Sequence, residues 1–327
     1  MQAPQPKRFG LLISNLGSPD SPEVSDVRKY LRQFLNDPFV IDMPWIFRYP
    51  FVNGLILPTR PKKSSDAYQK IWDKNGSPLV FHTSNLAKKL NQRLPFPVEF
   101  GMRYGTPSIQ TAIEKLVHQA VNYIIFLPLY PQYSFSASES AIHEFERGLK
   151  KYSDRISGTS VEYFYRHPAF IQAVAAKIQA SVEEHHPEKI LLTYHGIPEK
   201  QLSKTKNQTN YRDQCLETSK LIQEALNFAP ETITTSFQSR LGPVQWIKPY
   251  TDHVLKELPK QGVKRMIAVS PSFTADCLET LEEIQMRYHD DFLANGGEAF
   301  HYVPCVNSSD LFVDAIQQII EPYHFMK

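Results

Sequence analysis

The dominant feature of the sequence is a regular alternation of short apolar runs with amphipathic stretches. Stretches with apolar residues three and four apart, such as 23–36, 109–120 and 311–320, separate the runs. The apolar runs have the length of strands and occur at residues 9–15, 98–104, 123–130, 161–166, 189–195, 232–238, 265–271 and 300–306. This pattern is typical of parallel β-sheets covered by helices, because such strands are buried on both faces.

The runs fall into two sets of four, with the division near residue 167. Because domains have about 150 residues each, we predict an α/β protein of two similar doubly wound, Rossmann-like domains with parallel four-stranded sheets, over 1–166 and 167–327. A C-terminal helix over 309–322 is expected, with the option of crossing back to the first domain. Residues 37–78 fit neither pattern, which predicts either a functional insertion such as a lid or an irregular packing segment.

Composition and charge narrow the class of protein. The net charge is +2 with scattered Lys and Arg, which gives little support to nucleic-acid binding. Cys215, Cys277 and Cys305 are far apart, which favours a reducing compartment and argues against a zinc or iron–sulfur framework. The first ten residues lack the apolar core of a signal peptide, and prolines and charges interrupt the most apolar region, 37–58. We therefore predict a cytoplasmic protein without a transmembrane helix.

Titratable side chains follow two of the predicted strands. His195 ends the run 189–195 and precedes a glycine, so its imidazole is expected at the carboxyl end of a strand, where ligands of α/β sheets bind. A helix with Asp276 as its predicted N-cap follows another strand. On that helix Glu279 and Glu283 are four residues apart, which places their carboxylates on one face.

An imidazole opposite a carboxylate can accept a proton near neutral pH or bind a metal such as Fe²⁺. Two protein ligands are too few for a closed structural metal site but suit a metal in transit. From spacing alone, a hydrolase, a structural histidine and a solvated acidic face remain equally open. The chain has no G-x-S-x-G, P-loop or G-x-G-x-x-G motif. Trp246, which follows a Gly-Pro pair, is suited to form a wall for a flat apolar ligand.

Several segments, taken in order, resemble the ferrochelatase family, whose members insert Fe²⁺ into a porphyrin to make haem. They are "LLISNLGSPD", "NGSPL", "GMRYGTPS", "LPLYPQYS", "YHGIP", "YRDQC", "SFQSRLGPVQWIKPYTD" and "FTADCLETLEEI", and they span roughly residues 9–306. The variant "ADCLETLEEI" resembles the form found in Gram-negative bacteria.

The resemblance implies a chelatase-like fold and assigns roles to particular residues. It implies that His195 accepts porphyrin N–H protons, binds the metal, or both, and that Glu279 is the carboxylate facing it. Asp276 and Glu283 are implied to form an acidic line for protons or metal leading toward solvent. The porphyrin-binding residues implied are Arg60, Tyr68 and Ser77 for the propionates, and Leu16, Arg103, Tyr104, Tyr130, Trp246 and Phe273 for the walls of the macrocycle pocket.

The implied reaction is that of a lyase that inserts Fe²⁺ into protoporphyrin IX, with release of two protons, as the last step of haem biosynthesis. Iron is then a substrate, and no permanently bound cofactor is expected. No iron–sulfur cluster is expected, because the chain ends at "PYHFMK" without the cysteine-rich extension of some members. Arg287 stands where some members have a third acid, and Cys277 where others have histidine, so the path along the helix is expected to differ.

The expected partners are a porphyrin and ferrous iron, with no nucleic acid, and the chain is expected to be a monomer or a homodimer. The apolar segment 37–60 is implied to be the lip through which porphyrin enters, with peripheral membrane contact through 37–58. Two alternatives stay open. One is a chelatase for another metal or tetrapyrrole, including coproporphyrin, and the other is a non-catalytic porphyrin or haem carrier.

Overall fold

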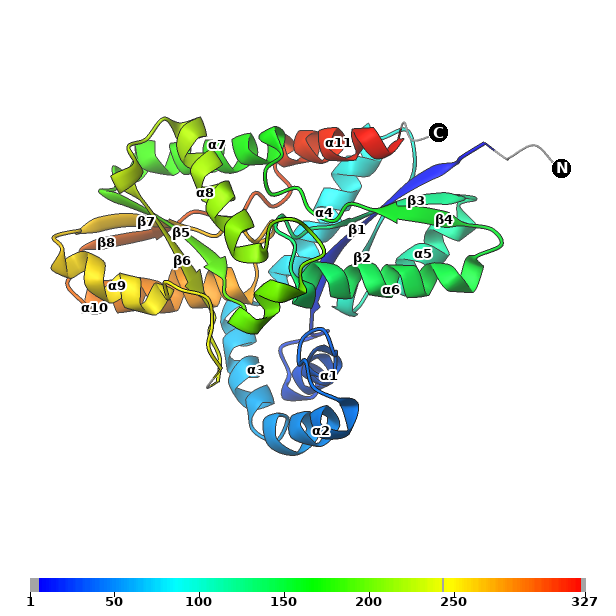
Figure 1. Ribbon diagram of the computed structural model, residues 1–327, viewed down its shortest axis with the longest axis horizontal. Coiled ribbons are helices and arrows are strands. Elements are labelled where there is room, and N and C mark those ends of the chain that lie inside the picture. The colour runs from blue at the N-terminus through cyan, green and yellow to red at the C-terminus, as the bar shows by residue number, and fades with distance from the viewer. Residues whose placement is uncertain (1–5, 243, 325–327) are drawn as a thin grey trace. The chain divides into compact units, whose positions relative to one another are not determined.

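The computed structural model describes residues 6–242 and 244–324, whose elements are labelled in Figure 1. The first five residues and the last three of "PYHFMK" lie outside the described residues. Contacts divide the chain into unit 1 (1–129, 135–163 and 316–327) and unit 2 (130–134 and 164–315). The C-terminal helix α11 (Asp310–His324) begins in unit 2 and ends in unit 1.

Each unit contains a parallel four-stranded sheet with the same strand order, which confirms the predicted fold class. In unit 1 the order is β2-β1-β3-β4, and in unit 2 it is β6-β5-β7-β8. The strands are β1 (Phe9–Ser18), β2 (Val98–Gly105), β3 (Tyr123–Pro128), β4 (Ser157–Ser160), β5 (Lys189–His195), β6 (Ile233–Gln238), β7 (Arg265–Val269) and β8 (Ala299–Tyr302).

One predicted strand is wrong. The apolar run 161–166 is not a strand, and the fourth strand of unit 1 is the small, polar segment Ser157–Ser160 just before it. A Cβ atom at Gly158 would lie 2.6 Å from the Ile124 carbonyl oxygen and 2.8 Å from the Phe145 ring, so this edge strand requires a residue without a side chain. The apolar residues of the run are buried as part of a loop, which gives them the composition of a strand without its pairing.

Helices connect the strands. The α-helices before α11 are α1 (Val24–Leu35), α2 (Trp45–Pro50), α3 (Arg60–Ile71), α4 (Pro78–Arg93), α5 (Ile109–His118), α6 (Ser140–Leu149), α7 (Pro168–His185), α8 (Tyr211–Leu226), α9 (Thr251–Lys260) and α10 (His289–Ala294). Three π-helices are η1 (Phe51–Ile56), η2 (Phe135–Glu139) and η6 (Glu279–Tyr288). The short 3₁₀ turns are η3 (Lys150–Tyr152), η4 (Glu199–Lys204) and η5 (Pro230–Thr232).

The region 37–78, predicted to be either a functional insertion such as a lid or an irregular packing segment, is largely helical. It contains α2, η1 and α3, together with the start of α4. Several prolines of the region lie at a helix start or inside a helix: Pro61 is in the first turn of α3, and Pro50 ends α2 where the chain continues as η1, whereas Pro38 and Pro58 lie in turns. Proline is tolerated in a first turn because its missing N–H has no intrahelical partner there.

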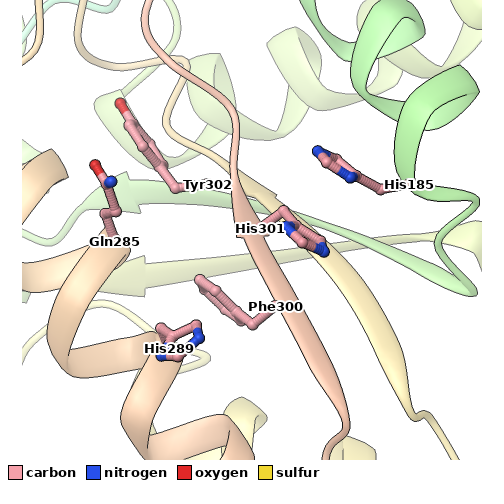
Figure 2. Close-up of a pocket in the computed structure, with 6 residues that line it drawn as sticks. All are labelled: His185, Gln285, His289, Phe300, His301 and Tyr302. Atoms are coloured by element: carbon pink, nitrogen blue, oxygen red, sulfur yellow. The ribbon is translucent and has the colours of Figure 1, made fainter.

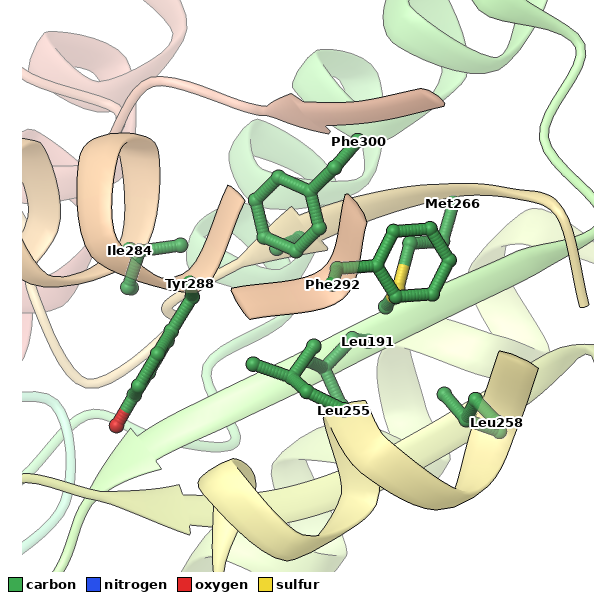
Figure 3. Packing of buried hydrophobic residues seen from close by; sticks show 9 residues of the cluster. Leu191, Leu255, Leu258, Met266, Ile284, Tyr288, Phe292 and Phe300 are labelled. Atoms are coloured by element: carbon green, nitrogen blue, oxygen red, sulfur yellow. The ribbon is translucent and has the colours of Figure 1, made fainter. Parts of the chain in front are cut away.

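The faces of each sheet follow from the strand order, because parallel crossover connections are right-handed. In unit 2 the connection from β5 to β6 runs one way across the sheet, whereas the next two run the other way. Helix α8 therefore covers one face together with α7, and α9, η6 and α10 cover the other (Figure 1). Figure 3 shows the core on the second face, where Leu191, Met266 and Phe300 of the sheet contact Leu255, Ile284 and Phe292 of the helices.

No helix within residues 6–242 and 244–324 combines the length and the apolar character needed to cross a bilayer.

Gly17 fixes the close approach of β1 and β2 near their carboxyl ends. Its φ is +106°, a conformation that L-residues with a side chain rarely adopt. It pairs with Tyr104, and a Cβ atom added to Gly17 would lie 1.7 Å from the Tyr104 carbonyl oxygen. Any side chain at this position would force the two strands apart.

We expect Gly17→Ala to lower the free energy of unfolding by at least about 2 kcal/mol, because backbone strain and steric overlap add. The matched control is Gly54→Ala, since a Cβ there would meet nothing described within 4 Å. Urea denaturation of the two variants measures the difference. Equal midpoints would show that the glycine is not required by the close approach of the strands.

Candidate functional site

The candidate site lies at the carboxyl ends of β5 and β7 in unit 2. These strands are neighbours at the point where the strand order reverses, so the connections from their ends leave toward opposite faces of the sheet. His195 is the last residue of β5. The segment after β7 passes through Ser270 and Phe273 before it reaches Glu279. The predicted position of His195 at a strand end is therefore confirmed.

Three neighbours hold the main chain and ring of His195. Its N–H donates to the Ser272 hydroxyl at 3.1 Å, and its carbonyl accepts from the Tyr211 hydroxyl at 2.8 Å. Its ring atom Nδ1 lies 2.6 Å from the Gly196 carbonyl oxygen, which can only accept. In the neutral ring the proton is therefore on Nδ1, and the lone pair of Nε2 is available to a proton or a metal.

One aromatic side chain lies beside this imidazole, and a second lies beside the residues that follow it. The Phe273 ring meets the His195 ring edge to face, with centroids 6.2 Å apart. Trp246 forms a bridge with Pro198, and a Cβ atom at Gly196 would come within 3.3 Å of its ring. The indole N–H donates to the Leu241 carbonyl oxygen at 2.9 Å, which fixes the ring. The structure thus brings His195, Trp246 and Phe273 together in unit 2.

Glu279 is the first residue of a π-helix, whereas the sequence predicted an α-helix. Hydrogen bonds from i to i+5 widen each turn, and such helices occur often at functional sites. The apolar side chains of this segment are only half buried: Ile284 and Tyr288 are buried, but Leu278 and Leu281 are partly exposed. The Glu279 carbonyl oxygen accepts a 3.0 Å hydrogen bond from Gln238, the last residue of β6.

Glu283 is buried, and donors surround its carboxylate. Ser239 contributes its N–H at 3.0 Å and its hydroxyl at 2.5 Å, and the Tyr288 hydroxyl lies at 2.9 Å. Burial and the Glu283 charge together raise the pKa of Tyr288 well above its ordinary value, so this phenol stays a donor. Arg287 lies 3.6 Å from Glu283 and 2.9 Å from Glu282. Burial lowers the pKa of Arg287, but these two carboxylates outweigh it and raise the pKa overall.

Asp276 is not the N-cap that the sequence predicted, since Leu278 occupies that position. Its buried carboxylate instead accepts hydrogen bonds from the Tyr302 hydroxyl at 2.6 Å, Asn307 Nδ2 at 2.7 Å and the Cys305 N–H at 3.2 Å. These donors satisfy a buried charge better than the few free N–H groups of a helix start would. Burial raises the pKa of the Tyr302 hydroxyl well above its ordinary value.

Within the part of the chain that the structure describes, no three His, Cys, Asp or Glu side chains are grouped closely enough to hold a metal ion.

Other residues with predicted roles lie in unit 1, where Arg103 and Tyr104 belong to a buried network. Asp37 accepts from the Arg103 guanidinium at 2.5 Å and from the hydroxyls of Tyr104 and Ser140 at 2.7 Å each. Tyr104 is 1% exposed, and burial raises the pKa of its phenol well above the ordinary value. The wall contact of Tyr104 stays a prediction, and the structure shows that its hydroxyl donates to Asp37 and that its ring lies beside the Arg103 guanidinium.

The remaining predicted residues are dispersed. Arg60 starts α3, Tyr68 is buried on the same helix with its ring against Tyr30, and Ser77 is buried at the N-cap of α4. Leu16 is partly buried in β1. Arg60, Tyr68, Ser77 and Leu16 all belong to unit 1. Tyr130 follows β3 in sequence but belongs to unit 2.

The sequence analysis did not single out several residues that build the site. Gln238, Ser239, Ser272 and Tyr211 each bond to a candidate residue or to its main chain. Their one visible signal is a polar side chain directly after an apolar run, as in "TSFQS", or inside a quoted motif such as "YRDQC". The role of Asp37 was even harder to predict from the sequence, because the side chains that bond to it, those of Arg103 and Tyr104, are 66 or more residues away.

A cavity of about 340 Å³ opens on unit 2 and does not include His195 or Glu279 (Figure 2). Its lining residues are His185, Gln285, His289, Phe300, His301 and Tyr302. His185 and His301 stack with their ring centroids 3.8 Å apart and their planes at 5°. Burial and the neighbouring His185 lower the pKa of His301, His289 adds to this, and Glu184 opposes it.

Since the folded state holds the pKa of His301 below its unfolded value of about 6.5, the unfolded state binds the proton more tightly. Stability from this group is complete above that pH and is lost as pH falls through the folded pKa. We expect His301→Phe, which keeps a ring on His185, to lose less stability than the wild type between pH 7.5 and pH 5. Urea midpoints over that range measure the effect, and parallel curves would contradict it.

Comparison with known sequences places this geometry among relatives. The model of the ferrochelatase family matches residues 8–323. A ferrochelatase of Coxiella burnetii (strain Dugway 5J108-111) is 41% identical over 332 residues, covering 95% of this chain and 93% of the relative. One from Legionella pneumophila (strain Lens) is 43% identical over 330 residues, covering 96% and 98%. Both relatives come from Gram-negative bacteria, as the variant "ADCLETLEEI" predicted.

Solved structures with the same fold include two chelatases. SirB from Bacillus subtilis with Fe³⁺ matches 98% of this chain and 98% of its own, with a TM-score of 0.59 at 13% identity. CbiX, described as the terminal enzyme for biosynthesis of siroheme in denitrifying bacteria, matches 96% and 99%, with a TM-score of 0.51 at 12% identity. At such identities the likeness concerns the fold.

Proposed function

The chain belongs to the ferrochelatase family, and from this premise we propose that it is a lyase that inserts Fe²⁺ into protoporphyrin IX, forming protohaem and releasing two protons. The observation that carries the proposal is the hydrogen bond of His195: Nδ1 faces the Gly196 carbonyl oxygen, so in the neutral ring the lone pair is on Nε2. Iron is a substrate in this proposal, and the chain itself needs no resident cofactor or iron–sulfur cluster.

His195 is the proposed base. A pyrrole N–H of the porphyrin gives its proton to Nε2, and the freed nitrogen lone pair binds the metal. General base catalysis of this kind accelerates a reaction by roughly 10²–10⁴-fold. Glu279, at the start of η6, is the proposed second acceptor and oxygen ligand for the entering Fe²⁺. Phe273, beside the imidazole, and Trp246, beside Gly196, supply apolar walls for the macrocycle.

Asp276 and Glu283 are proposed to continue a line for protons or metal beyond Glu279. One support is the contact between Asp276 and the Tyr302 hydroxyl at 2.6 Å, because Tyr302 also lines the cavity of Figure 2. A hydroxyl can pass a proton from one neighbour to the next without ionising, so the raised pKa of Tyr302 is no obstacle. In this proposal the Tyr302 hydroxyl, which donates to Asp276 in the structure, turns to accept the proton of Asp276 and passes its own toward the cavity.

For the porphyrin itself, we propose that Arg60, Tyr68 and Ser77 serve the propionates and that Leu16, Arg103 and Tyr130 serve the macrocycle. Arg60 and Leu16 are partly exposed, which suits direct contact. Tyr68 is buried, so we assign it a supporting role.

The test is an anaerobic assay of Fe²⁺ insertion into protoporphyrin and coproporphyrin, followed by absorbance. We expect turnover with protoporphyrin, and a loss of at least about 100-fold in kcat for His195→Ala and Glu279→Gln with porphyrin binding retained. His118→Ala, a change at an exposed histidine of α5, is the matched control. Binding without turnover would identify a carrier instead, and preference for another metal or for coproporphyrin would identify a different chelatase.

We further propose that the protein rests on the cytoplasmic side of a membrane through 37–58. The support is a group of large apolar side chains on α2 and η1 that face solvent: Trp45, Ile46, Phe47, Tyr49, Phe51 and Leu55. Exposed apolar groups of this size mark binding surfaces more often than chance exposure. Arg60, Lys62 and Lys63 follow closely in sequence and would favour anionic lipids.

We expect the protein to sediment with vesicles that contain anionic lipid, and a Trp45→Glu/Phe47→Glu variant to stay in the supernatant. Leu216→Glu, at an exposed leucine of α8, is the control and should sediment like the wild type. Equal sedimentation of all three proteins would rule out this surface as the contact.

A further inference from the structure

We infer that Gln238 is a positioning residue that sets the placement of Glu279 relative to His195. The inference rests on the proposed roles of those two residues and deepens them. Gln238 is the last residue of β6, pairs with His195 across the sheet, and is 1% exposed. A buried side-chain amide at a sheet edge is costly unless each of its polar groups has a partner.

The side chain of Gln238 reaches the π-helix. Its Nε2 donates to the Glu279 carbonyl oxygen at 3.0 Å, and its Oε1 accepts from the Thr193 hydroxyl at 3.1 Å. Because a carbonyl oxygen can only accept, Nε2 must face Glu279, which settles the orientation of the amide. The bond fixes the first residue of η6 at its main chain and does not involve the Glu279 carboxylate.

The main chain of Gln238 holds the other partner. Its carbonyl oxygen accepts a hydrogen bond of 2.8 Å from the N–H of Gly196, the residue whose own carbonyl faces His195 Nδ1. A Cβ atom at Gly196 would lie 2.8 Å from that same oxygen, so the contact depends on glycine. Gln238 is therefore bonded to both sides of the site, by its main chain on one side and its side chain on the other.

Three buried hydroxyls hold the amide in place. Thr193 donates to Gln238, so it accepts from Thr251 at 2.8 Å, and Thr251 in turn accepts from Ser236 at 2.8 Å. The bonds thus run in one direction, from Ser236 through Thr251 and Thr193 to Gln238 and on to the Glu279 carbonyl. In a chain of hydrogen bonds that all run in the same direction, each bond polarises the next, so the network resists rearrangement.

The consequence is kinetic. Without the donor, the start of η6 is no longer tied to β6, and Glu279 can move relative to His195. A displacement of about 1 Å in a catalytic group can reduce the rate by about 10²-fold. Porphyrin binding through Trp246 and Phe273 does not depend on this bond, so kcat should fall while KM for the porphyrin stays unchanged.

The experiment compares Gln238→Met with Gln214→Met. Gln214 is a matched control because it is equally buried and its amide also makes two bonds, from the Tyr133 N–H at 2.7 Å and to the Thr209 carbonyl at 3.0 Å. Both variants should lose similar stability by thermal denaturation. We expect Gln238→Met to lower kcat for Fe²⁺ insertion by about 10–100-fold. For Gln214→Met we expect a kcat that differs from the wild-type value by less than about twofold.

Gln238→Glu supplies a readout that a merely structural role would not move. A protonated carboxyl can still donate to the Glu279 carbonyl oxygen, whereas an ionised one repels it. The ratio of variant to wild-type kcat should therefore fall as pH rises. Thr193→Val, which removes the hydroxyl that orients the amide, should lower kcat less than Gln238→Met and provides the comparison if the methionine variant does not fold.

Equal kcat for Gln238→Met and Gln214→Met, or a pH-independent ratio for Gln238→Glu, would overturn the inference and leave the proposed function intact. Failure of the wild type to insert iron into either porphyrin would overturn the proposed function, and this inference with it.

Discussion

The reversal of strand order between β5 and β7 is the constraint on which the candidate site depends. Right-handed connections send the chain to opposite faces on either side of this point, so the two strand ends are left open by the helices. His195 ends one of these strands, and the segment leading to Glu279 leaves the other. The Ser272 hydroxyl joins the two ends by accepting the His195 N–H. The sheet therefore places His195 at one strand end and starts the segment that leads to Glu279 at the neighbouring end.

Buried polar networks then hold in place the segments that the strand order brings close together. Asp37 in unit 1 and Asp276 and Glu283 in unit 2 are buried carboxylates, and each accepts from at least three donors. A buried charge with such partners is stable, whereas removing one donor leaves an expensive unsatisfied group. The donors around Asp276 and Glu283 thus limit how the π-helix and the strand ends of unit 2 can move.

Sequence reasoning predicted the two sheets and the place of His195, because apolar runs and a following glycine are local signals. It could not predict the π-helix, since the residues of η6 have ordinary helical spacing and its register depends on distant partners such as Gln238 and Ser239. The run 161–166 was wrongly predicted to be a strand, because a buried loop and a buried strand can have the same apolar composition. The region 37–78 contains prolines that suit helix starts as well as loops.

The arrangement around Arg287 bears on the direction in which protons would leave Glu279. Arg287 contacts Glu282 and Glu283, so the outer part of η6 ends in a cation instead of a further carboxylate. The Arg287 charge balances one of these two carboxylates, which weakens the attraction of that side for a proton or for Fe²⁺. On the other side, Asp276 bonds to Tyr302, which lines an open cavity. In the proposed reaction the charges therefore favour Asp276 and Tyr302 over the outer turn of the π-helix as the way out for protons.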